Sequence, residues 1–290
     1  MPLLAYLPSP SSGEIRIGPL PLRAYGLLIA LGVYVAVVVA GRRYRRQGGD
    51  PELITALAIW AVPGGIIGAR IYHVATDYEL YTHHLTGIFK IWDGGLGIWG
   101  GVLGGVAVGV WVAHRRGADV RLLLDVVAPA LPLAQAIGRW GNYFNQELFG
   151  RPTTLPWALR IDLAHRPLQY AQYKTFQPTF LYECLWDLAV VGVVLLVERR
   201  ARLRKGYLFA VYVATYTFGR FWIESLRIDF AHKFFGLRLN DWTSIIVFVV
   251  AVGFIIRGRR PEPEALPQPG DTPPEAEATA DEASDLDTRA

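Results

Sequence analysis

One stretch of the sequence combines ionisable and amide side chains with glycines, directly after an apolar run. It covers residues 138–151 and places Arg139, Asn142, Asn145 and Glu147 within nine residues. A guanidinium and two amides offer hydrogen-bond donors, and a carboxylate offers an acceptor or a base. Because a guanidinium donates two parallel hydrogen bonds and stays protonated, the stretch predicts chemistry on an anionic group such as a phosphodiester.

A second set of polar residues recurs at helical spacing. Tyr216, Arg220, Glu224 and Arg227 follow one another at intervals of four, four and three, which places them on one helical stripe. One interpretation is an internal ladder of ion pairs that holds the end of the helix. The other is an anion site in which Glu224 orients the guanidiniums and Arg139, with its neighbouring amides, supplies the opposing half.

The elements that must position these residues are expected to be membrane helices. The 290 residues are 52% hydrophobic and 19% charged, with a mean hydropathy of +0.26. The net charge of +4 arises from short basic clusters between apolar runs, so nucleic acid is not an expected partner. The single cysteine, Cys184, excludes a disulfide framework, and no Cys/His spacing indicates a metal or another cofactor.

Seven apolar runs are each long enough for one helical span. They cover residues 24–40, 53–75, 94–114, 122–138, 180–197, 207–223 and 242–256. We therefore predict an all-α fold in which residues 1–257 form a polytopic membrane bundle of seven transmembrane helices, with an outer segment at about residues 139–178.

Basic residues predict the orientation of this bundle. Dense clusters occupy every second connection, at 42–46, 115–121, 199–205 and 257–260. Because such clusters stay on the cytoplasmic side, the N-terminus is expected outside and the C-terminus in the cytoplasm. The first cluster follows its apolar run, which is the reverse of a signal peptide. Residues 258–290, rich in Pro, Glu, Asp and Ala, are expected to form a disordered acidic cytoplasmic tail.

Glycines recur on two of the expected spans. They repeat every fourth residue, at 64 and 68 on the second span and at 97, 101, 105 and 109 on the third. Small residues let helix backbones approach closely in lipid, so we interpret them as packing positions. The competing interpretation is a phosphate cradle at Gly94 and Gly95, where a helix N-terminus attracts anions.

With this orientation, polar residues of separate spans converge on the outer face. Tyr25 begins the first span, Arg70 and Arg139 lie near the outer ends of the second and fourth, and Arg220 and Glu224 end the sixth. A charge inside a span is costly, so such residues usually face a partner or a wet cavity. Snorkelling at a helix end explains any single arginine, but it explains the set less well.

The stretch Gly138-Arg139-x-Gly141-Asn142-x-x-Asn145-x-Glu147-x-x-Gly150 resembles the signature of the bacterial prolipoprotein diacylglyceryl transferases. The resemblance extends over nearly all of residues 20–257 but not over the tail. Its other motifs are Tyr25-Gly26, Gly68-Ala69-Arg70, Trp92-Asp93-Gly94-Gly95, Gln177-Pro178-Thr179-Phe180-Leu181-Tyr182-Glu183 and Arg220-Phe221-x-x-Glu224-x-x-Arg227.

The resemblance implies a reaction in the outer leaflet of the bacterial cytoplasmic (inner) membrane. The diacylglyceryl group of phosphatidylglycerol moves to the thiol of the lipobox cysteine in a prolipoprotein signal peptide, which forms a thioether and releases glycerol phosphate. This is the first step of lipoprotein maturation. The implied partners are phosphatidylglycerol, the prolipoprotein and membrane lipids, and no cofactor is implied.

The residues expected in the site follow from the pattern and the resemblance together. The expected catalytic residues are Arg139, Glu147, Tyr216, Arg220 and Glu224. The expected substrate-binding residues are Tyr25, Arg70, Asn142, Asn145, Gly150 and Arg227.

The chain departs from the family at Trp99-Gly100-Gly101, where many members have His-Gly-Gly. A thiolate and not a thiol attacks, so a proton acceptor is useful, and here it would be Glu147, Glu224 or Tyr216. Our hypothesis is instead that the arginines which hold the phosphodiester also stabilise the thiolate electrostatically. The nucleophile belongs to the substrate, so Cys184 need not take part.

Other classes share some of these features. A lipid flippase or small-solute transporter also uses intramembrane arginines and close glycine packing, but it more often has repeated halves, which this sequence lacks. A seven-span photoreceptor is disfavoured because the last span has no lysine for a Schiff base. The segment from Arg151 to Gln177 is expected above the site, either as a linker cap or as a gate for the substrates.

Overall fold

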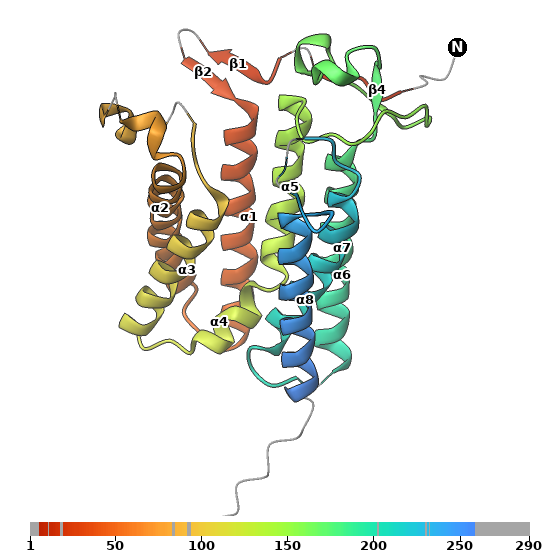
Figure 1. The fold of residues 1–290 in the computed structure, drawn as a ribbon. Coiled ribbons are helices and arrows are strands. Elements are labelled where there is room, and N and C mark those ends of the chain that lie inside the picture. Colours follow the sequence, from red (N-terminus) through yellow and green to blue (C-terminus); the bar gives the residue numbers. More distant parts are fainter. Residues whose placement is uncertain are drawn as a thin grey trace, which may run out of the picture.

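The structure is a computed structural model that describes residues 6–10, 12–17, 20–82, 85–91, 94–201, 203–229, 231 and 233–258. Long helices dominate this part of the chain (Figure 1). They are α1 (Ala24–Arg46), α2 (Pro51–Thr76), α3 (Ile98–Arg115), α4 (Val120–Val127), α5 (Ala130–Asn145), α6 (Thr179–Arg200), α7 (Tyr207–Glu224) and α8 (Leu239–Gly258). Each of the seven predicted spans coincides with one of these helices or, for residues 122–138, with the pair α4 and α5.

Short elements join the helices, and they refine the expectation of an all-α fold. Three antiparallel pairs are present: β1 (Glu14–Ile17) with β2 (Leu20–Arg23), β3 (Leu159–Arg160) with β4 (Thr175–Phe176), and β5 (Lys233–Phe234) with β6 (Leu237–Arg238). Single 3₁₀ turns occur at Tyr78–Tyr81, Leu85–Phe89, Leu163–His165 and Leu168–Tyr170. Strands of two to four residues are too short to show the period-two pattern that predicts a strand.

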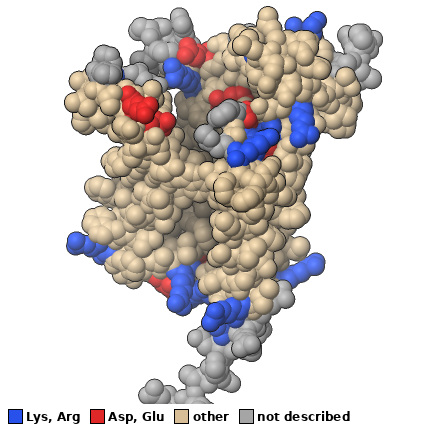
Figure 2. All heavy atoms as spheres, in the orientation of Figure 1, with Lys and Arg blue, Asp and Glu red and all other residues tan. Residues whose placement is uncertain are grey.

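The helices fit a multi-pass membrane protein. The helices α1, α2, α6 and α8 are each long and apolar enough to cross a membrane, and α4 with α5 makes a fifth candidate if the bent pair is one span. Figure 2 shows Lys, Arg, Asp and Glu gathered toward the two ends of the molecule, with a band of other residues between them. Such a band lets lipid chains contact the middle of the bundle without burying charge.

A break between α4 and α5 sets the direction of the helix that carries the signature stretch. Asp119 begins α4, because its carboxylate accepts hydrogen bonds from the backbone N–H groups of Arg121 and Leu122. Pro129 lies at the break, where it cannot donate a backbone hydrogen bond, and the two helix axes differ by 43°. The second helix, α5, then packs between α1 and α6.

A carboxylate of α4 also fixes the beginning of α7. Asp125 accepts hydrogen bonds from the backbone N–H groups of Gly206, at 2.7 Å, and Phe209, at 3.2 Å. The first turn of any helix has unpaired N–H groups, so this carboxylate acts as a cap supplied by another helix. At the same end of the bundle, Arg43 of α1 forms a 2.7 Å ion pair with Glu198 of α6.

Glycines bring α2 and α3 into close contact, as predicted, although a neighbouring row of α3 makes the tightest approach. A Cβ added to Gly104 would lie 2.5 Å from the carbonyl oxygen of Gly64 and 3.1 Å from the Cα of Gly68. In the predicted row, a Cβ on Gly105 or Gly109 would have ordinary or nearly ordinary clearance, at 3.4 Å and 3.7 Å. The direction in which one helix faces another depends on its rotation, which a four-residue repeat alone does not fix.

This packing predicts that Gly104→Ala destabilises the protein. The new methyl group meets backbone, which cannot swing away, and such overpacking typically costs about 1–3 kcal/mol. Gly192→Ala on α6 is the matched control, since a Cβ there has nothing within 4 Å. Thermal unfolding in detergent, followed by tryptophan fluorescence, should give a lower Tm for Gly104→Ala alone. Equal Tm values for the two variants would contradict the close approach.

Candidate active site

Two of the predicted arginines meet at one carboxylate. Arg139 of α5 lies 3.1 Å from Oε2 of Glu183, measured from Nη1, and Arg220 of α7 donates through Nη1 to Oε1 of the same residue. Glu183 lies in the second turn of α6, so this single side chain joins three helices. The expectation that guanidiniums from separate helices meet at one end of the bundle is confirmed.

The ion pairs continue from Arg220 to a second buried carboxylate. Glu224, fully buried in the last turn of α7, receives Nη2 of Arg220 at 2.6 Å and Nε of Arg238 at 3.2 Å. Arg227 lies 3.6 Å from the same carboxylate, and the amide of Asn240 donates to it at 3.1 Å. Arg220 and Glu224 of the predicted stripe therefore form an internal ladder. Because α7 ends at Glu224, Arg227 lies just after the helix, and it still contacts the same carboxylate.

Asp229 is the last carboxylate in this series of ion pairs. Its two carboxylate oxygens pair with Nε of Arg227 at 2.7 Å and with Nη2 of Arg238 at 2.8 Å. Burial alone would raise the pKa of Asp229, but the hydrogen bond from Arg227 and the positive charges of both arginines outweigh burial, and the pKa is lowered. The carboxylate therefore stays ionised and keeps both guanidiniums in place.

At the end of the series opposite Asp229, Arg139 has two further neighbours. Its Nε lies 3.8 Å from Oδ2 of Asp187, one turn beyond Glu183 on α6, and its Nη2 donates to the phenol oxygen of Tyr216 at 3.4 Å. Within the described part of the chain, Oδ2 of Asp187 is buried and has no hydrogen-bond partner. Arg139 thus lies among two carboxylates and a phenol.

We call this set the ion-pair chain. Its members are Asp187, Arg139, Glu183, Arg220, Glu224, Arg227, Arg238 and Asp229. Four carboxylates match four guanidiniums, which is what burial of charge in an apolar bundle requires.

In two of these ion pairs the arginine is more exposed than its carboxylate, whereas Asp229, with 32% of its side chain exposed, is the most exposed member of the ion-pair chain. The side chains of Arg139 and Arg220 are 20% and 17% exposed, whereas those of Glu183 and Glu224 are 4% and 0% exposed. Each of these two arginine side chains is therefore more exposed than the carboxylate with which it pairs. Since a guanidinium has five N–H donors in a rigid fork, donors not used by the carboxylates are available to an anion on the accessible side. This arrangement can bind a phosphodiester although the set as a whole is neutral.

Glu147 is held by the two amides of the signature stretch. Nδ2 of Asn142 donates to its Oε1 at 2.9 Å, and Nδ2 of Asn145 lies 3.3 Å from the same oxygen. The structure thus directs these amides toward a carboxylate, not toward a shared anion site with Arg139. The loop around them is strained, because Gln146 and Leu148 adopt positive φ values of 50° and 58°.

Gly150 joins three segments around this loop. Its N–H donates to the carbonyl oxygen of Gln177 at 2.9 Å, and the next N–H, that of Arg151, donates to the carbonyl of Leu226 at 3.0 Å. A Cβ on Gly150 would lie 3.0 Å from the Cβ of Gln177 and 3.1 Å from the oxygen of Leu226. Gly150 therefore allows the ends of α5, α6 and α7 to pack together.

The remaining predicted residues lie in different places. Tyr25, in the first turn of α1, packs its ring against Gly141, where a Cβ would lie 3.0 Å from its Cε2. It lies close enough to Glu147 and Arg139 to interact with their charges. Glycine at position 141 thus allows the ring of Tyr25 to pack directly against α5.

Arg70 is engaged elsewhere. Its guanidinium donates to the backbone carbonyls of Gly87, Ile88, Gly94 and Gly95 at 2.6 to 2.9 Å. None of these hydrogen bonds reaches the ion-pair chain, and they tie the segment between α2 and α3 to α2. Trp92 and Asp93 of the family motif lie outside the described residues.

The outer segment forms a packed cap with its own core. Phe149, Leu159, Ile161 and Phe176 bury their side chains against Phe180 at the start of α6. The strands β3 and β4 bring two of these side chains together. A packed core distinguishes this segment from a loose linker.

Sequence reasoning did not select four residues of the ion-pair chain: Glu183, Asp187, Asp229 and Arg238. Glu183 and Asp187 are acids within the apolar run 180–197, and a buried acid in a span is by default a functional candidate. Arg238 lies in the connection between α7 and α8, near Asp241, whose carboxylate accepts its backbone N–H at 3.0 Å. The acids in the apolar run carried a usable signal, whereas Arg238 had none beyond its charge.

Comparison with known proteins assigns the family. The family model described as prolipoprotein diacylglyceryl transferase matches residues 13–257. A Frankia alni protein named phosphatidylglycerol–prolipoprotein diacylglyceryl transferase is 57% identical, over 92% of this chain and 71% of that protein. Proteins of Streptomyces coelicolor and Mycobacteroides abscessus with the same enzyme name are 50% and 46% identical, over 92% and 97% of this chain and 78% and 86% of their own lengths. The chain belongs to the prolipoprotein diacylglyceryl transferase family.

Proposed function

We propose that this protein transfers the diacylglyceryl group of phosphatidylglycerol to the lipobox cysteine of prolipoproteins. The observation that carries the proposal is the pair of partly exposed guanidiniums, Arg139 and Arg220, fixed side by side by one buried carboxylate, Glu183. The names of the relatives, which cover most of this chain, supply the substrates. A lipid flippase or small-solute transporter is not favoured by this family membership.

In the proposed reaction, the substrate's sulfur attacks the glycerol carbon that is bonded to phosphate. The S–C bond forms as the C–O bond breaks, and glycerol phosphate leaves with the bonding electrons. Arg139 and Arg220 hold the phosphate and stabilise the charge that develops on it, which is the usual role of fixed donors in such a site. Their field also favours the thiolate over the thiol.

Of the two carboxylates among the predicted proton acceptors, the geometry favours Glu147. Glu224 is fully buried and bound by Arg220, Arg227 and Arg238, which leaves it no access to a thiol. Glu147 receives only amide donors in the described part of the chain, both on one oxygen. Its other oxygen is available for the proton.

The proposed topology follows from charge and from the chemistry of the substrates. We infer seven spans within residues 1–257, with the N-terminus outside, the C-terminus in the cytoplasm and the site toward the outer leaflet of the bacterial cytoplasmic membrane. The basic clusters between spans support this orientation. An exported acceptor and a lipid donor both require a site in that leaflet.

The direct test uses purified protein, phosphatidylglycerol vesicles and a lipobox peptide. We expect a thioether-linked diacylglyceryl peptide by mass spectrometry together with free glycerol phosphate. Arg139→Lys and Arg220→Lys should each reduce kcat about 10²-fold, because lysine keeps the charge but loses the planar fork. Arg160→Lys, in the exposed outer cap, is the control. Wild-type turnover in both site variants would contradict the proposal, as would transport without either product.

Glu183→Gln tests whether the central carboxylate positions the arginines. The amide keeps the shape of the side chain but removes the charge that fixes both guanidiniums, so we expect kcat to fall at least about tenfold without a rise in KM for phosphatidylglycerol. Glu198→Gln removes a similar ion pair at the other end of the same helix and should leave kcat unchanged. An increase in KM alone would assign Glu183 to lipid binding, and circular dichroism would identify a misfolded variant.

The orientation predicts which cysteines a membrane-impermeant maleimide reaches in intact cells. In a Cys184→Ala background, Thr154→Cys in the outer cap should be labelled, whereas Arg116→Cys, just after α3, should be labelled only after lysis. Both positions are exposed, so folding does not hide them. The reverse pattern would overturn the proposed topology without affecting the assigned chemistry.

A further inference from the structure

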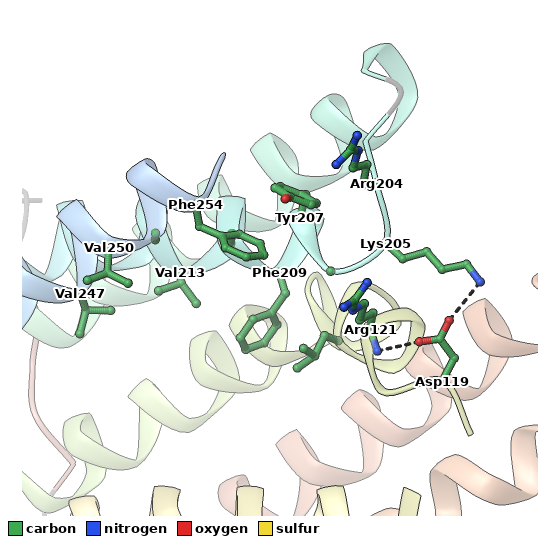
Figure 3. A pocket seen from close by; sticks show the side chains of 14 residues that line it. Asp119, Arg121, Arg204, Lys205, Tyr207, Phe209, Val213, Val247, Val250 and Phe254 are labelled. Carbon is green, nitrogen blue, oxygen red and sulfur yellow. Dashed lines mark hydrogen bonds and ion pairs between the residues drawn. The ribbon is translucent and has the colours of Figure 1, made fainter. Parts of the chain in front are cut away.

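A cavity lies at the end of the bundle opposite the ion-pair chain. It measures 920 Å³ and is formed by α4, α7 and α8 together with the segment before α7 (Figure 3). We call it the α4/α7/α8 cleft. Its volume is in the range of small-molecule sites. Tyr207, which lines it, and Arg220 are 13 residues apart on α7, or about 20 Å along the helix axis. The cleft is therefore separate from the site described above.

The walls of the cleft are apolar and run along the helices. On α7 they are formed by Tyr207, Ala210 and Val213, and on α8 by Val247, Val250, Ala251 and Phe254. Both sets recur at helical spacings of three and four residues, so each is a stripe on one helix face. The rings of Tyr207 and Phe254 stack at 4.5 Å and join the two stripes near one end. A groove of this shape accommodates an acyl chain parallel to the helix axes.

The end of the cleft nearest the basic connections has a positive rim. Arg121, Arg204 and Lys205 line it, and Asp119 is its acidic member. Figure 3 shows Lys205 directed to Asp119, which it contacts at 3.0 Å. The hydrogen bond from Lys205 lowers the pKa of Asp119, which therefore remains ionised. The rim thus has a net positive charge, three bases against one acid.

We propose that the α4/α7/α8 cleft binds one anionic phospholipid of the cytoplasmic leaflet, with its headgroup on Arg121, Arg204 and Lys205 and one acyl chain between α7 and α8. The positive rim complements the negative charge of the headgroup, and the apolar stripes on α7 and α8 accommodate the acyl chain. A free phosphate would meet the rim but leave the stripes empty, and a zwitterionic lipid would fill the stripes without satisfying the rim. The leaflet assignment rests on the proposed orientation, whereas the lipid class does not.

The cleft also lies where lipid can affect the helices that carry the site. The segment 204–206 is held to α4 through the hydrogen bond from Gly206 to Asp125 and the ion pair between Lys205 and Asp119. A lipid bound there spans the junction of α4, α7 and α8. Its role would be to hold α7, whose other end carries Arg220 and Glu224, in one position.

The test measures lipid retention by native mass spectrometry of the whole chain, with phosphatidylserine and phosphatidylcholine of identical acyl chains. Phosphatidylserine is anionic but is not the proposed donor, so the readout is independent of turnover. The variant with Arg121→Gln, Arg204→Gln and Lys205→Gln should lose phosphatidylserine retention at least about tenfold, since each surface base contributes about fivefold for anionic lipid. The matched control is Arg42→Gln, Arg45→Gln and Arg116→Gln, which removes three exposed bases outside the cleft.

Two further variants should change the retention of phosphatidylserine in opposite directions. Asp119→Asn retains a side-chain oxygen for the cap of α4 but frees Lys205, so phosphatidylserine should be retained more strongly. Val250→Trp fills the apolar groove and should reduce retention without changing the rim. Equal retention of the two lipids by the wild type, or equal loss in the matched control, would overturn the proposal. Transferase activity, measured separately, decides the proposed function independently of this result.

Discussion

The site depends on one buried carboxylate that two guanidiniums share. Glu183 of α6 receives Arg139 of α5 on one oxygen and Arg220 of α7 on the other. Two positive groups brought this close in an apolar bundle would repel each other, and removal of one partner from a buried ion pair typically costs about 3–5 kcal/mol. The carboxylate therefore both permits and fixes the approach of three helices. The close spacing of the guanidiniums is in turn what a single phosphodiester requires.

In two of its ion pairs the base is more exposed than the acid, and this difference lets the neutral set select an anion. If the acids were as exposed as the bases, an incoming phosphate would meet both signs of charge. Arg139 and Arg220 are instead more exposed than Glu183 and Glu224, the carboxylates with which they pair. Donors oriented in advance, in surroundings that exclude water, stabilise developing negative charge more than mobile groups in water do. Glu183 and Glu224 thus orient donors that are more exposed than they are themselves.

The sequence predicted the apolar runs, the glycine contact between two helices and the meeting of Arg139 with Arg220, because each has a spacing or composition that physics constrains. It did not predict which groups the polar side chains would bond. Asn142 donates to Glu147, and Arg70 donates to backbone carbonyls, because those partners depend on helix rotation and loop path. Glu183 was visible as an acid in an apolar run, but only the three-helix contact reveals its role.

The strained loop after α5 connects Arg139, which lies on that helix, with Glu147, the proposed base. Gln146 has positive φ, and its side chain accepts from the N–H of Asp162 at 2.8 Å and donates to its carboxylate at 2.7 Å. A non-glycine residue keeps such a conformation only when its surroundings fix it, and here the outer cap does so. The strain ends α5 at Asn145 and returns Glu147 to the amide of Asn142. The cap therefore positions Glu147, the proposed proton acceptor, relative to Arg139. This gives the packed segment a part in the proposed chemistry beyond covering the site.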